Sequence, residues 1–127
     1  AGLVAITAEP LSPTPGLAIV IGSIGALIMY FGTKMLENFG IDDVVGAIPV
    51  HMFAGIFGTL VVPLTNSDTS FGTQFLGTLS VCVFSFVLSY LVFLILKTTV
   101  GLRISKAAEK LGTDKSEIGV TAYAIRD

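Results

Sequence analysis

Residues 41–64, IDDVVGAIPVHMFAGIFGTLVVPL, decide the fold, and the rest of the chain is organised around them. The stretch opens with two carboxylates, Asp42 and Asp43, and then runs apolar for long enough to cross a bilayer, which takes about 20 residues of helix. The only histidine of the sequence, His51, lies well inside this run. An ionisable side chain at such depth is costly, so it usually faces a bundle interior or a cavity.

On an α-helix, His51 would share one face with four small residues, because positions three, four and seven apart line up. These neighbours are Ala47, Ala54, Gly55 and Gly58. A small-residue stripe allows either close packing against another helix or room for a solute. Both interpretations stay open: a packed helix whose histidine bonds a neighbouring helix, or a pore lined by His51, with Ala47 and Gly55 beside it.

The composition is that of a membrane protein. The chain has 127 residues, of which 53% are hydrophobic and 13% charged, with a mean hydropathy of +0.88. Soluble domains carry about 25% charged residues. The net charge of −2 gives no reason to expect nucleic-acid binding. One histidine and one cysteine, Cys82, do not make a metal site, and no motif predicts a cofactor or an enzyme's catalytic group.

Three stretches are long and apolar enough to span a membrane as helices. We expect these helices at residues 16–36, 44–64 and 74–97. Residues 1–7 are apolar but too short to span, and the prolines that follow break any helix. We interpret them as the end of a preceding helix, so the sequence looks cut from a longer chain. The predicted fold class is an all-α membrane protein.

The ends of the central helix carry their own signals. The pair Asp42 and Asp43 sits where negative charge favours a helix start, so capping is the simplest interpretation and attraction of a cation is the alternative. Pro49 removes one backbone hydrogen bond, so we expect a local kink just before His51. Gly40 is expected to end the preceding helix.

The basic residues predict the orientation of the chain. With three spans, all seven lie on one side of the membrane. They are Lys34, Lys97, Arg103, Lys106, Lys110, Lys115 and Arg126. The positive-inside rule puts that side in the cytoplasm. We therefore expect a membrane part, residues 1–100, and a cytoplasmic tail, residues 101–127, in which Ser105 caps a short helix through Leu111 and Gly112 ends it.

Four stretches together resemble the ammonium transporter family (Amt/Mep/Rh). They are AGLVAIT at 1–7, IDDVVGAIPVH at 41–51, FAGIFGTL at 53–60, and GLRIS…LGTDKSEIG…AY at 101–123. Their order and spacing match the last third of such a transporter. The resemblance implies the end of the eighth helix and the ninth to eleventh helices of an eleven-helix bundle, which contains an inverted repeat and assembles as a homotrimer in the cell (inner) membrane.

The resemblance also implies a function. The parent protein would carry ammonium or ammonia across the lipid bilayer for nitrogen uptake, and His51 would match the second of the family's two pore histidines. The first lies in the missing half, so the fragment alone is expected to be inactive. An ammonium-sensing membrane domain coupled to a downstream signalling domain is the alternative, and a small structural membrane subunit is a third class.

The tail resembles the family's cytoplasmic region, which carries signals between subunits and meets PII-type signal proteins. Its candidate regulatory residues are Gly101, Arg103, Gly112, Asp114, Ser116, Gly119 and Tyr123. Ser116 occupies the position where eukaryotic members carry a regulatory threonine, and an ordinary exposed serine is the alternative interpretation.

Overall fold

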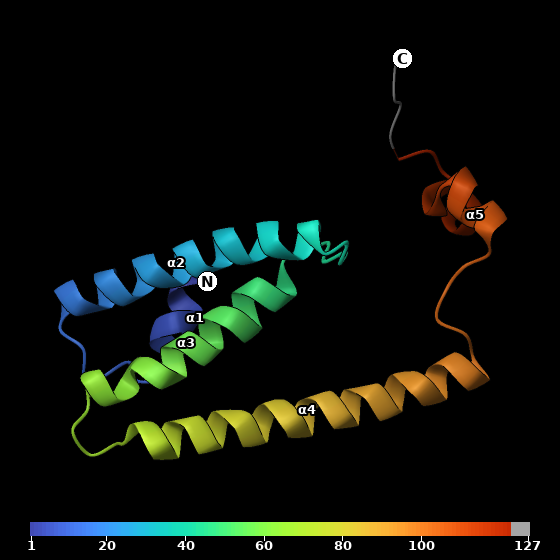
Figure 1. The fold of residues 1–127 in the computed structure, drawn as a ribbon. Helices are drawn as coiled ribbons and strands as arrows, with labels where there is room; N and C mark the ends of the chain where they lie inside the picture. Colours follow the sequence, from blue (N-terminus) through green and yellow to red (C-terminus); the bar gives the residue numbers. More distant parts are fainter. Residues whose placement is uncertain (123–127) are drawn as a thin grey trace. The chain divides into compact units, whose positions relative to one another are not determined.

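The structure, a computed structural model, describes residues 1–122. Tyr123, one of the candidate tail residues, lies outside the described residues, as do residues 124–127. Within residues 1–122 every regular element is helical and no strand occurs, which confirms the predicted all-α class (Figure 1).

Helices follow one another along the described chain. They are α1 (Gly2–Thr7), α2 (Pro15–Asn38), the π-helical η1 (Ile48–Phe53), α3 (Ala54–Val61), the 3-10 helix η2 (Val62–Leu64), α4 (Phe71–Thr99), α5 (Lys106–Leu111) and the π-helical η3 (Asp114–Ile118). Contacts divide the chain into two compact units, residues 1–84 and the part from Ser85 onward, and the boundary falls inside α4.

Two helices in the described chain are long and apolar enough to cross a membrane, α2 with 24 residues and α4 with 29. They cover the predicted stretches 16–36 and 74–97. The central apolar helix is shorter than predicted, because it runs over Ile48–Leu64 rather than from residue 44. Residues 44 and 45 form a turn and Gly46 has a φ of +69°, so the chain is not yet helical there.

Helix α2 begins and ends with recognisable local signals. The Thr14 hydroxyl accepts a hydrogen bond from the Leu17 amide at 3.3 Å, and Pro15 occupies the first turn, where its missing N–H costs nothing. At the other end Gly40 adopts a φ of +69°, and the amides of Gly40 and Ile41 bond back to carbonyls of the last turn. Gly40 therefore ends α2, as predicted.

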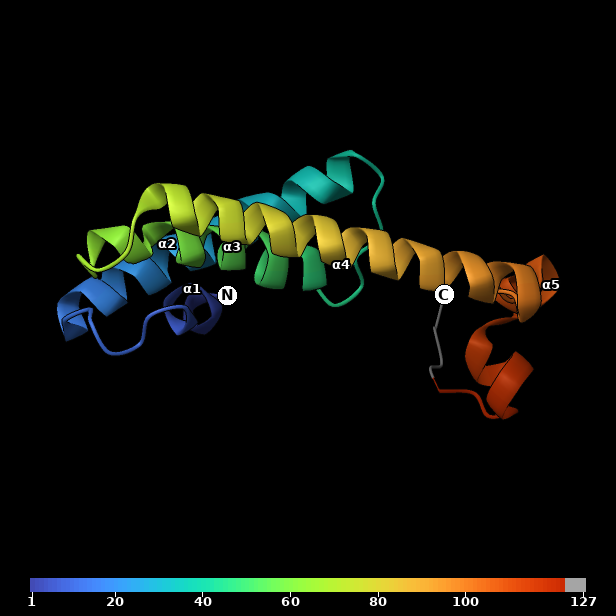
Figure 2. The same cartoon turned by 90° about the horizontal axis from the view of Figure 1, so that it is seen from below.

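The core of the first unit is built around α1, which lies between α2 and α3 (Figures 1 and 2). Ala5 of α1 is 1% exposed. A Cβ atom added at Gly25 of α2 would lie 2.6 Å from the Ala5 Cβ, and one added at Gly58 of α3 would collide with the Ala5 carbonyl oxygen. The three helices thus pack through small residues at close range, as membrane helices do.

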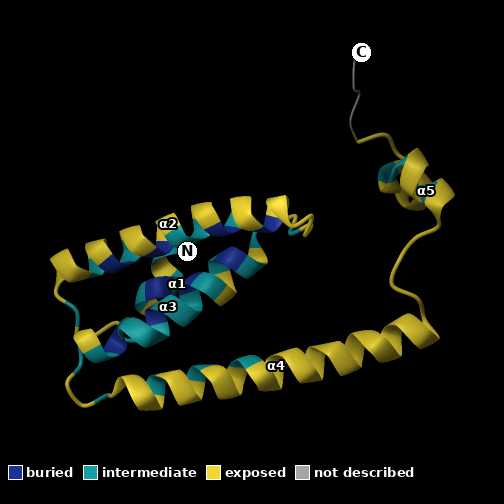
Figure 3. Cartoon of the chain, in the orientation of Figure 1, coloured by how far each residue is buried: buried dark blue, intermediate teal, exposed yellow. Residues whose placement is uncertain are grey.

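Helix α4 differs from α2 and α3 because none of its residues is buried (Figure 3). Apolar side chains lie on all sides of this helix, with a few polar ones such as Gln74 and Thr78 among them. A helix of this kind belongs in lipid or inside a larger protein.

The second unit contains the end of α4 and the short helices of the tail. The Ser105 hydroxyl accepts a hydrogen bond from the Ala108 amide at 3.2 Å, and Gly112 follows the last residue of α5 with a φ of +95°. Both predicted ends of this helix are therefore confirmed. Gly119, with a φ of +75°, ends η3 in the same way.

Candidate functional site

Asp43 prepares the helix that carries the histidine. Its carboxylate accepts hydrogen bonds from the amides of Ala47 at 2.8 Å and Ile48 at 2.7 Å. These amides belong to the first turn and have no carbonyl partner within the helix, so Asp43 caps the helix start. Asp42 is exposed beside it.

His51 lies in the π-helical segment η1. Pro49 near its start has no N–H, and its ring is fully buried, 3.1 Å from where a Cβ atom would stand on Gly32 of α2. Phe53, at the other end of η1, approaches the same glycine. The disturbance expected at Pro49 therefore takes the form of a widened helix of six residues. Such π segments are frequent at functional sites.

The histidine faces a cavity of about 310 Å³ between the central helix and the first half of α4, within residues 1–84. The cavity is lined by His51, Met52, Gly55, Ile56 and Thr59 from η1 and α3, and by Gln74, Gly77, Thr78, Val81 and Cys82 from α4. His51 and Gly55 thus line the same cavity. Ala47 is not among the lining residues, and its place in a conduction path stays a prediction.

The structure divides the stripe of small residues that the sequence placed on one face. Ala54, which is 0% exposed, and Gly58 are buried, Gly58 against α1. His51 is exposed on the cavity instead. The reason is the π segment, whose hydrogen bonds run from i to i+5, so the 3.6-residue register does not hold between His51 and Ala54. Close packing and an open face therefore occur on the same helix.

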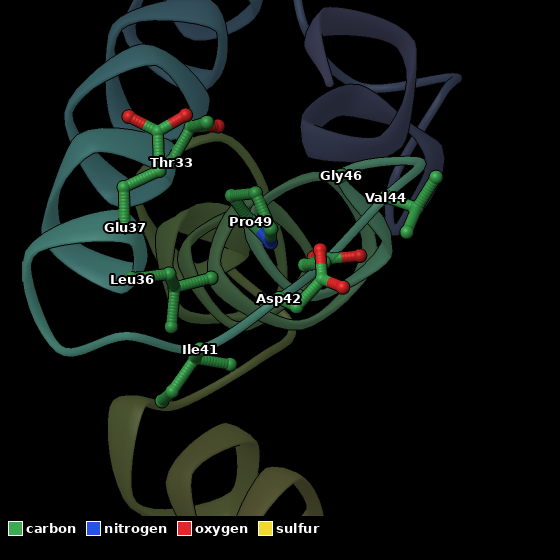
Figure 4. A pocket seen from close by; sticks show the side chains of 9 residues that line it. Thr33, Leu36, Glu37, Ile41, Asp42, Val44, Gly46 and Pro49 are labelled. Carbon is green, nitrogen blue, oxygen red and sulfur yellow. The ribbon is translucent and has the colours of Figure 1, made fainter. Parts of the chain in front are cut away.

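A second, smaller pocket of about 250 Å³ lies where α2 turns into the central helix (Figure 4). It is lined by Thr33, Leu36, Glu37, Ile41, Asp42, Asp43, Val44, Gly46 and Pro49. The Asp43 carboxylate is already engaged by two amides. Among the described residues, no group of histidine, cysteine and acidic side chains is arranged to hold a metal ion.

The candidate tail residues that the structure describes all belong to the second unit. Gly101, Gly112 and Gly119 all have positive φ, which glycine adopts readily. The Asp114 carboxylate accepts a hydrogen bond from the Ala122 amide at 2.9 Å, and this bond lowers the pKa of Asp114 below its ordinary value. Ser116 is exposed.

The sequence analysis did not predict the residues of α4 that line this cavity. Gln74, Thr78 and Cys82 follow one another at four-residue spacing, which puts them on one helix face. That spacing was a usable signal, but the other residues of this helix made the segment look uniformly apolar.

The fold and the site define a helical membrane protein in which a histidine faces a cavity between helices. The family model described as the Ammonium Transporter Family matches residues 1–123. The chain therefore belongs to the ammonium transporter family, and its resemblance to that family is confirmed.

Curated relatives agree with this assignment. The chain is similar to the ammonium transporter Amt2 of Archaeoglobus fulgidus, with 35% identity over 97% of this chain and 31% of that protein. It is also similar to the ammonium transporter Amt2 of Methanocaldococcus jannaschii, with 33% identity over 97% of this chain and 31% of the relative. Ammonium transporter 1 of Schizosaccharomyces pombe is 29% identical over 100% of the chain and 30% of its own length. The chain thus spans about a third of these relatives. No solved structure matches it.

Proposed function

We propose that the chain is the C-terminal third of a transporter that moves ammonium or ammonia across the cell (inner) membrane, with His51 lining its pore. The observation that carries the proposal is the position of His51, exposed on a cavity within an apolar helix instead of packed among apolar side chains. Family membership and the names of the curated relatives, which are transporters, support it.

The chemistry of the site fits a neutral or transiently neutral solute. A bare cation loses its hydration in an apolar passage, at a cost of many kcal/mol. Ammonia is small and uncharged, so a passage in which ammonium leaves its proton behind excludes other cations. An imidazole in such a passage accepts or relays a hydrogen bond. Gly55, one turn from His51, lines the same cavity.

The rest of the pore belongs to the part of the transporter outside these residues. Sites at the interface of inverted repeats need both halves, so residues 1–127 alone do not transport. The division into a membrane part and a cytoplasmic tail, the homotrimer, regulation through Ser116 and its neighbours, and binding of a PII-type protein are further parts of the proposal.

The test is ammonium-driven current through the full-length transporter that contains this chain, with and without potassium. We expect His51→Ala to assemble normally, because it leaves no buried charge, and to change the rate or the selectivity. His51→Glu places a carboxylate at depth, so potassium should compete with ammonium. Met35→Leu, a volume-conserving change at an exposed position of α2 that does not line this cavity, is the control. If both His51 variants assemble and keep the wild-type rate and selectivity, His51 is a packing residue and the pore proposal fails.

A further inference from the structure

The segment that follows the apolar part of α4 has the opposite charge balance to the chain before it. Residues 97–117 contain five basic and three acidic side chains, whereas residues 1–96 contain one basic and five acidic ones. All five basic side chains of the segment are exposed. They are Lys97, Arg103, Lys106, Lys110 and Lys115. Positive charge is therefore concentrated at one end of a long apolar helix.

The backbone leaves the helix soon after the first of these residues, Lys97. Gly101 has a φ of +90°, and the amides of Val100 and Gly101 both bond the Leu96 carbonyl at 2.9 Å. Such a turn at glycine ends a helix. Lysine is a common anchor at the boundary between the hydrocarbon core and the headgroups. When α4 crosses the bilayer, the basic segment therefore begins at the membrane surface.

Exposed apolar side chains lie among the basic ones. Val100 is 82% exposed, Leu102 48% and Leu111 58%. A segment at a membrane surface covers such side chains by placing them at the boundary of the acyl chains, while its basic groups stay among the headgroups. The exposed side chains of this segment are thus of the two kinds that a lipid surface accommodates together.

Helix α5 presents two of the lysines on one face. Lys106 and Lys110 are four residues apart, so their side chains lie one helical turn from each other. The helix is capped by Ser105 and packs on η3, so the pair belongs to a folded element. Glu109 is the acidic residue of this helix and offsets part of the charge.

The charge selects the partner. Phospholipid headgroups that carry a net negative charge attract lysine and arginine close to the membrane, and four to eight such residues beside a transmembrane helix are typical of segments that bind anionic lipid. Residues 97–111 contain four of them. A lipid surface is also the partner that α4 itself brings within reach of this segment.

We propose that residues 97–111 form a binding surface for anionic phospholipids and hold the beginning of the tail against the leaflet at which α4 ends. The ammonium groups of Lys106 and Lys110 bind lipid phosphates, and Val100 and Leu102 lie against the acyl boundary. The inference goes beyond the proposed transport function. It rests on the crossing of the membrane by α4, which labelling from the two sides of the membrane tests separately.

The experiment uses the full-length transporter in phosphatidylcholine vesicles that contain increasing fractions of phosphatidylglycerol. A fluorophore on Ala107→Cys, an exposed position of α5, reports lipid contact through quenching by lipids with a spin label near the headgroup. The background has no other reactive cysteine. We expect quenching to increase with the fraction of phosphatidylglycerol and to decrease at high salt, because salt screens exposed charges.

Two kinds of variant separate charge from structure. Lys106→Gln and Lys110→Gln should each shift the equilibrium between lipid-bound and water-exposed label about fivefold toward water, the usual effect of one basic residue at an anionic membrane. Glu109→Gln is the matched control on the same helix. It changes the charge in the opposite direction, so it should maintain or increase the quenching.

Several outcomes would overturn the inference. Quenching that is equal in neutral and anionic vesicles, or unchanged in the two lysine variants, means that anionic lipid is not bound. A label that is shielded from water but not quenched by lipid places α5 against protein instead. A loss of quenching in Glu109→Gln as large as in the lysine variants means that the structure of α5 and not its charge determines the contact. None of these readings involves transport, so the proposal for His51 is unaffected by them.

Discussion

At the scale of single residues, one polar contact joins parts of the chain that are far apart in sequence. The Asn66 side-chain amide donates a hydrogen bond to the Glu9 carboxylate at 2.8 Å and so links the loop after α1 to the loop after η2. The other side-chain hydrogen bonds within residues 1–122 join positions no more than eight apart. The contact lies outside the membrane-spanning helices, where a carboxylate stays ionised without a large desolvation cost.

The Glu9 contact predicts a pH dependence. The hydrogen bond from Asn66, followed by that from the Leu11 amide, lowers the pKa of Glu9 below its ordinary value of 4.5. A group whose pKa is lowered on folding stabilises the fold fully above its ordinary pKa, and this contribution is lost as the pH falls through the lower, folded value. Asn66→Ala should therefore raise the pKa of Glu9 toward 4.5 and reduce the loss of stability below that pH.

Thermal unfolding of the full-length protein at a series of pH values between neutral and strongly acidic measures this difference. Asn38→Ala, at the exposed end of α2, is the control and should follow the wild type throughout. If the wild type and Asn66→Ala lose stability equally on acidification, the Glu9–Asn66 bond contributes nothing to the fold.

Residue-level predictions from sequence succeeded where the cause is local. Gly40, Ser105 and Gly112 were all assigned to helix ends, because turn and cap preferences act within a few residues. The Glu9–Asn66 bond joins positions 57 apart, so no local pattern could indicate it. The buried hydroxyl of Thr78, which makes no hydrogen bond within residues 1–122, could not be predicted either. A sequence does not say which threonine hydroxyls bond a carbonyl of their own helix.

At the scale of helices, the central helix shows which features the periodic pattern of apolar residues can predict and which it cannot. The apolar run and Pro49 predicted a disturbed helix, and the structure contains one. Its form is a π segment in which Pro49 and Phe53 pack against Gly32 of α2, a contact that no local sequence pattern indicates. For this reason the predicted stripe was split into a packed part and a part that faces the cavity.

The packing of α1 between α2 and α3 predicts a sharp effect of one methyl group. A Cβ atom at Gly58 would collide with the backbone of Ala5, which cannot move away as a flexible side chain would. Gly58→Ala should therefore destabilise the full-length protein by about 1–3 kcal/mol, the usual cost of overpacking. Gly16→Ala in α2 is the control, since a Cβ atom there meets nothing within 4 Å and alanine favours a helix. Equal unfolding temperatures for Gly58→Ala and the wild type would show that α1 does not pack on α3 in the full protein.

At the scale of the whole molecule, the length and the exposure of α4 indicate what kind of surroundings this helix needs. Its 29 residues extend about 43 Å at 1.5 Å per residue, which exceeds the roughly 30 Å of a hydrocarbon core. A span of this length tilts or projects beyond the bilayer. With no buried residue, its apolar surface must be covered by lipid or by other parts of a protein.

The distribution of charge makes a prediction about the orientation of the full protein. All basic residues fall on one side if α2, the central helix and α4 each cross the membrane, and the positive-inside rule makes that side cytoplasmic. Single cysteines at Ser67 and at Lys106 should then react with a membrane-impermeant thiol reagent from opposite sides of sealed cells. The native Cys82, which is half-buried, is first replaced by alanine, and this background must retain transport. Ser67 precedes α4 and Lys106 follows it, so the experiment bears directly on whether this helix crosses the membrane. If Ser67 and Lys106 are labelled from the same side, α4 does not cross the membrane, and both the cytoplasmic tail and the orientation of the His51 cavity must be assigned anew.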